Sequence, residues 1–213
     1  MKKFFEGMFL RPEKFKMRLF LTIVGVLVQG FGLSWLIRLN MGTDAFTNFM
    51  LGCDIYMPTS FGTTQLIMNL LMFIYVIAFG RDMIGYGTIA NMVFLGYIVD
   101  FFGFFWDRIL PTGFFDVRWI AWFVLVPAFA LFILGAATYM SAGLGASPYD
   151  GIPFILSGQL KKPFKYVRMA WDISFMILGY LLGGGFGVVT IVLAFFAGPI
   201  INSVKKQVDR LLQ

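Results

Sequence analysis

Charged side chains lie inside apolar stretches of this sequence, where exposure to lipid would be costly. The main candidate is Asp172, in the segment Arg168-Met169-Ala170-Trp171-Asp172. Arg168 lies four residues before Asp172, so the two would pair on one face of a helix. At membrane depth, Asp172 predicts a site that binds a solute. Near the membrane surface, the same two residues would form an ordinary interfacial ion pair.

Amide side chains extend this set of polar residues within apolar stretches. Gln65 and Asn69 lie one turn apart, Asn91 lies well inside another stretch, and Gln29 lies in the middle of the first. Single amides in membrane helices more often join helices through hydrogen bonds than bind ligands. We nevertheless predict Asn69 and Asn91 as binding residues, because several of these polar positions recur in both halves of the chain.

The composition places these residues in a membrane protein. The 213 residues are 59% hydrophobic and only 13% charged, with a mean hydropathy of +0.82. A soluble domain carries about twice that charged fraction. The net charge of +6 comes from cations near the ends of apolar stretches, where they meet lipid head groups, so we expect no nucleic-acid partner.

The residue types also argue against catalysis. The chain has no histidine and a single cysteine, Cys53. Its spacing supports no pairing of a nucleophile with a base. We therefore expect no enzyme activity, no metal and no cofactor.

Six membrane spans are predicted, and the fold class is an all-α polytopic membrane protein. The spans cover about residues 19–37, 61–79, 84–105, 119–142, 167–182 and 188–204. The distribution of lysine and arginine places both termini in the cytoplasm. The expected organisation is a basic cytoplasmic segment at 1–17, a three-helix repeat at 18–110, a second at 119–204 and a cytoplasmic tail at 205–213.

The two halves of the chain share a signature. Met41-Gly42-Thr43-Asp44-Ala45-Phe46 recurs as Leu144-Gly145-Ala146-Ser147-Pro148-Tyr149, an offset of 103 positions. An odd number of spans in each half would insert the second copy upside down. Inverted repeats of this kind are typical of secondary transporters, whose substrate sites lie at the interface between the repeats.

Each signature predicts the start of a short helix. Ser147 is suited to the N-cap and Pro148 to the first helical position, and Thr43 or Asp44 can cap the first copy. Each helix would either lie on the membrane surface or enter the protein as a buried half-helix. In the second case the two N-terminal ends would face one central cavity, where Asp150 would also lie.

Several of these segments resemble one family of proteins. Leu39-Asn40-Met41-Gly42 followed by Asp44-Ala45-Phe46, the segment from Leu144 to Gly151, and the Gly96 to Asp100 segment are similar to YczE/YitT-type bacterial integral membrane proteins. The resemblance covers residues 18–204 and is closer in the second signature, since the first has no proline. It implies a protein of the bacterial plasma membrane, and it supplies no substrate.

The leading functional hypothesis is a small-solute membrane transporter, or the substrate-binding membrane subunit of an importer, with a polar site at the repeat interface. The alternative is a non-transporting membrane scaffold or regulatory protein. The expected partners are the lipid bilayer, a small polar solute, and a membrane protein or a second copy of the chain. The predicted substrate-binding residues are Asp44, Asn69, Asn91, Ser147, Asp150 and Asp172.

Overall fold

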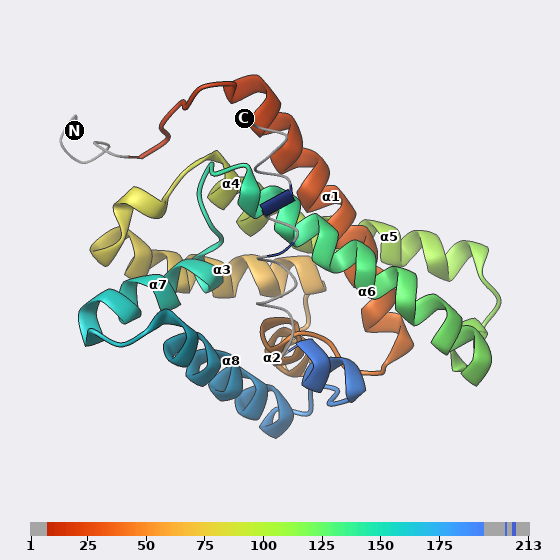
Figure 1. Ribbon diagram of the computed structural model, residues 1–213. Helices are drawn as coiled ribbons and strands as arrows, with labels where there is room; N and C mark the ends of the chain where they lie inside the picture. Colours follow the sequence, from red (N-terminus) through yellow and green to blue (C-terminus); the bar gives the residue numbers. More distant parts are fainter. Residues whose placement is uncertain (1–7, 194–202, 204–205, 208–213) are drawn as a thin grey trace.

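The computed structural model describes residues 8–193, 203 and 206–207, and this part of the chain is helical without a strand (Figure 1). The elements are α1 (Phe15–Leu39), α2 (Ala45–Asp54), α3 (Phe61–Phe79), η2 (Arg81–Met83), α4 (Tyr86–Ile89), η3 (Ala90–Phe94), α5 (Leu95–Ile109), η4 (Phe114–Asp116), α6 (Arg118–Ser141), α7 (Pro148–Leu160) and α8 (Phe164–Leu181). The segment η3 is a π-helical turn that joins α4 to α5 in one continuous helix.

Four helices in the described part are long and apolar enough to cross a membrane: α1, α3, the α4–α5 helix and α6. They coincide with the first four predicted spans to within a few residues. Large apolar side chains such as Phe101, Phe123 and Val126 point outward from α5 and α6. Exposed apolar surface on long helices suits contact with lipid, and the prediction of a polytopic helical membrane protein is confirmed.

The last two predicted spans differ from these four. The fifth coincides with α8, which carries Lys165, Arg168 and Asp172 and is not among the four apolar helices. A helix begins at Val188 where the sixth is predicted, but most of that span lies outside the described residues.

The helices α1 and α6 lie side by side (Figure 1), and small residues bring their backbones together. A Cβ atom on Gly32 would lie 2.8 Å from the carbonyl oxygen of Ala128. A Cβ atom on Gly135 would lie 2.6 Å from the carbonyl oxygen of Gly25. Gly135 lies 103 positions after Gly32, and Gly25 lies 103 positions before Ala128. The second contact is therefore the counterpart of the first, with the two halves of the chain exchanged.

The two signature turns are held by matching contacts. Gly42 and Gly145 have φ angles of 95° and 104°, a conformation that glycine adopts without strain. Beside the first turn, the Val189 N–H donates to the Met41 carbonyl oxygen at 3.1 Å. Beside the second, the Gly87 N–H donates to the Leu144 carbonyl oxygen at 2.7 Å. Each signature is therefore supported by the beginning of a helix from the other half of the chain.

Both signatures start short helices with the expected caps. The Asp44 carboxylate accepts from the Thr47 N–H at 3.1 Å at the start of α2, and the Ser147 hydroxyl accepts from the Asp150 N–H at 3.2 Å at the start of α7. At 10 and 13 residues, both helices are shorter than the roughly 20 residues that a span needs. Seven residues of α2 and six of α7 are buried, so both helices pack into the protein.

We expect Gly32→Ala to lower the stability of the protein by about 1–3 kcal/mol, because its methyl group would force α1 away from α6. The measurement is thermal unfolding of the purified full chain in detergent. Gly158→Ala is the matched control, since a Cβ atom there would meet nothing within 4 Å. Equal unfolding temperatures for both variants would contradict close α1–α6 packing.

Candidate functional site

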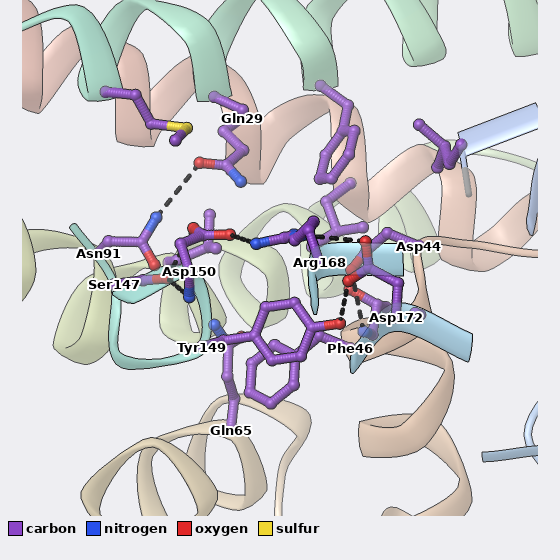
Figure 2. A pocket seen from close by; sticks show the side chains of 18 residues that line it. Gln29, Asp44, Phe46, Gln65, Asn91, Ser147, Tyr149, Asp150, Arg168 and Asp172 are labelled. Atoms are coloured by element: carbon purple, nitrogen blue, oxygen red, sulfur yellow. Dashed lines mark hydrogen bonds and ion pairs between the residues drawn. The ribbon is translucent and has the colours of Figure 1, made fainter. Parts of the chain in front are cut away.

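A cavity of about 100 Å³ lies at the N-terminal ends of α2 and α7, bounded by α1, α3, α6, α8 and the π-helical turn (Figure 2). Its lining is mostly polar on the α7–α8 side. The lining residues are Gln29, Leu33, Asp44, Ala45, Phe46, Thr47, Gln65, Asn91, Leu95, Phe132, Ala136, Met140, Ser147, Tyr149, Asp150, Arg168, Asp172 and Leu193.

Most of the predicted binding residues meet at this cavity. The five that line it are Asp44, Asn91, Ser147, Asp150 and Asp172. Asn69 does not line it. That side chain is 1% exposed, and neither of its amide atoms has a hydrogen-bond partner in the described part of the chain. The role of all six predicted residues in binding a substrate stays a prediction.

Arg168 on α8 joins two of these carboxylates (Figure 2). Its Nη1 lies 2.9 Å from Asp150 Oδ1, and its Nε lies 2.9 Å from Asp172 Oδ2. The guanidinium carbon also lies 5.1 Å from the centre of the Tyr149 ring, within the range of a cation–π interaction. One cation therefore ties the start of α7 to the middle of α8.

Hydroxyl groups satisfy the remaining oxygens of both carboxylates. The Tyr149 hydroxyl donates to Asp172 Oδ1 at 2.6 Å. The Tyr139 hydroxyl and the Ser147 hydroxyl donate to Asp150 Oδ2 at 2.9 and 2.7 Å. Buried polar networks in which every acceptor has a donor hold their members in one geometry.

Two other lining residues, Asp44 and Gln65, are not satisfied in this way. Asp44 Oδ1 accepts from the Thr47 N–H, but Asp44 Oδ2 is buried and has no donor among the described residues. The Gln65 Oε1 atom is also buried without a donor there. Farther along, Asn91 Nδ2 donates to Gln29 Oε1 at 3.3 Å. Asp44 and Gln65 therefore each carry an acceptor atom for which the described protein supplies no donor.

The lining draws on equivalent positions in the two halves of the chain. Six pairs of lining residues differ by 103 in number, and a seventh differs by 102. The pairs are Gln29 and Phe132, Leu33 and Ala136, Asp44 and Ser147, Phe46 and Tyr149, Thr47 and Asp150, Gln65 and Arg168, and Asn91 and Leu193. The rings of Phe46 and Tyr149 stack with centroids 4.5 Å apart and planes 23° from parallel.

Sequence reasoning missed three polar residues at this site. It found the Arg168–Asp172 pair from the four-residue spacing, but it did not place Arg168 among the binding residues. The contact between Arg168 and Asp150 spans eighteen positions across a turn, and no local spacing predicts it. Tyr139 and Tyr149 were hidden among the many aromatic residues of an apolar chain, although Tyr149 follows Pro148 in the second signature.

Comparison with known proteins identifies a family whose function is unknown. The model of a family described as a family of unknown function, DUF6198, matches residues 16–206. The uncharacterized membrane protein YczE of Bacillus subtilis (strain 168) is 26% identical over 191 residues, which cover 88% of this chain and 85% of that protein. An uncharacterized protein of Haemophilus influenzae is 31% identical over 130 residues, covering 60% of this chain and 56% of that protein. No solved structure matches the chain.

We expect Arg168→Met to destabilise the protein by about 3–5 kcal/mol, because it leaves two partly buried carboxylates without their cation. Asp107→Asn is the control, since it removes the Arg38–Asp107 pair, in which the Asp107 side chain is 68% exposed; such pairs contribute about 0–1 kcal/mol. Thermal unfolding in detergent compares the two. A loss no larger for Arg168→Met than for Asp107→Asn would refute the bridging role.

Proposed function

Because this chain belongs to the DUF6198 family of unknown function, we propose its activity from the site itself: a small-solute membrane transporter, or the substrate-binding membrane subunit of an importer. Its setting is the bacterial plasma membrane. The observation that carries the proposal is the polar cavity, in which one guanidinium and three aspartates gather inside an otherwise apolar protein. Ionisable groups at such a depth are costly and mark pathways for solutes by default.

The proposed architecture has six spans arranged as two inverted three-helix repeats. The matching contacts of Gly32 and Gly135, and those of the two signature turns, support it. The low hydropathy of α8 does not oppose a fifth span, because Arg168 and Asp172 face the cavity and each other. In this arrangement α2 and α7 are half-helices that enter from opposite sides, and the cavity lies at the repeat interface.

The transport proposal is tested with the full chain in two steps. Thermal-shift screening of small polar solutes in detergent identifies those that stabilise the protein, which happens when a ligand binds only the folded state. Uptake of each stabilising solute is then measured in proteoliposomes. We expect at least one to be taken up by the protein and not by empty liposomes.

We expect Asp150→Asn and Asp172→Asn to reduce this uptake by about tenfold or more, since each weakens a charge-assisted contact at the cavity. Asp107→Asn should leave uptake unchanged, because that exposed side chain lies outside the cavity. If correctly inserted Asp150→Asn and Asp172→Asn proteins take up the solute as fast as the wild type, these residues do not belong to the site. Stabilising solutes that never cross the membrane would favour the scaffold or regulatory alternative.

The six-span arrangement places the α7–α8 turn and both termini in the cytoplasm. Reporter fusions within Lys161–Lys162 and at Gln213 should therefore both give cytoplasmic signals, since the lysines and arginines gather on that side. A fusion between Pro111 and Gly113 should report the outside. A cytoplasmic signal there, or an outside signal at either of the others, would contradict the inverted arrangement.

A further inference from the structure

We propose that this cavity binds a small organic cation with N–H donors, an ammonium or guanidinium group, against the Asp44 carboxylate and the Gln65 amide. The inference rests on the proposed function, because it names the substrate class of the same cavity. It also makes a claim that binding alone can test, without transport.

The first argument is the charge balance of the cavity. Among the described residues, its lining holds one basic side chain, Arg168, and three acidic ones, Asp44, Asp150 and Asp172. Arg168 is committed to Asp150 and Asp172, whose four oxygens all accept hydrogen bonds. Asp44 is left without a cation among the lining residues. A carboxylate with a buried oxygen and no cation beside it is costly, and a bound cation would lower that cost.

The second argument is the hydrogen-bonding capacity of two lining residues, Asp44 and Gln65. Asp44 Oδ2 has no donor in the described part of the protein, and Gln65 is 3% exposed with its Oε1 in the same condition. Figure 2 shows the Gln65 side chain extending from α3 toward Tyr149. Oε1 itself faces Gly96, and a half-turn of the amide would exchange it with Nε2. With the amide turned, Gln65 Oε1 and Asp44 Oδ2 would both be acceptors for a ligand that donates hydrogen bonds.

The third argument compares the two halves of the chain. Gln65 occupies the position equivalent to Arg168, at an offset of 103. In the second half the Arg168 guanidinium lies between the capping segment of α7 and the middle of α8. In the first half the equivalent side chain is shorter and uncharged, while the capping segment of α2 carries Asp44. The first-half positions equivalent to Asp150 and Asp172 hold Thr47 and Asn69, so a ligand cation in the first half would face the single carboxylate of Asp44.

The size and composition of the site limit the cation further. A cavity of about 100 Å³ has room for several water molecules, since about 10–15 Å³ of such space holds one, so a small ligand fits. Within the described residues, no group of three or more histidine, cysteine or acidic side chains is placed to hold a metal ion. The chemistry therefore favours a small amine or guanidine over a divalent metal.

The test measures binding of methylammonium chloride to the purified full chain in detergent by isothermal titration calorimetry. We expect saturable binding that Asp44→Asn weakens by about tenfold or more. Asparagine is as good an N-cap as aspartate, so this variant keeps the cap of α2 and removes the charge. Asp44→Ser, which copies the cap of α7, serves as a second variant should Asp44→Asn fail to fold. Asp107→Asn is the matched control and should bind as the wild type does.

Tetramethylammonium chloride provides the comparison for the N–H donors, because it carries the same charge without any. We expect it to bind more weakly than methylammonium. No saturable methylammonium binding, unchanged affinity in the Asp44 variants, or equal binding of both cations would overturn the proposal.

The failures of the two proposals can be told apart. If a neutral or anionic solute is taken up and methylammonium neither binds nor competes, transport stands and the cation site is refuted. If methylammonium binds through Asp44 and no solute crosses the membrane, the cation site stands and transport is refuted.

Discussion

The interior of this protein depends on one guanidinium shared by two carboxylates. Arg168 is the only basic residue that lines the cavity in the described part of the chain, and it contacts Asp150 on α7 and Asp172 on α8. Without it, two partly buried negative charges would face each other with hydroxyl donors alone. The same interaction joins α8 to the start of α7 at the cavity, which both residues line. Tyr149 supports the arrangement, because its ring contacts Arg168 and its hydroxyl donates to Asp172.

Close backbone packing sets the frame around this interaction. Small residues such as Gly32 and Gly135 bring α1 and α6 together. The signature turns at Gly42 and Gly145 each form a backbone hydrogen bond with the start of a helix from the other half of the chain. These contacts occur in pairs that are about 103 positions apart. A Cβ atom at several of these glycines would meet backbone atoms, which cannot move away as a flexible side chain would. The glycines are therefore explained by packing and need no role in binding.

The two halves of the cavity differ where their chemistry matters most. The capping pair is Asp44 and Thr47 in one half and Ser147 and Asp150 in the other, so the acid and the hydroxyl exchange places. Gln65 occupies the position equivalent to Arg168, and its Oε1 has no donor among the described residues. The paired framework therefore carries unequal side chains: the carboxylates around Arg168 are fully hydrogen-bonded, while Asp44 Oδ2 and Gln65 Oε1 have no donor among the described residues.

The sequence by itself determined the membrane class, the first four spans, the cap Ser147, a cap at Thr43 or Asp44, and the pairing of Arg168 with Asp172. All of these follow from local features: the length of apolar runs, the preferences of helix ends, and the four-residue spacing of one helix face. Only the tertiary structure decided which polar residues meet. It brought Arg168 to Asp150 and Tyr139 to Ser147, and it left Asn69 outside the cavity lining. The reason is physical: the direction of a side chain toward a distant partner depends on how the helices cross, and helix crossing is set by packing across the whole chain.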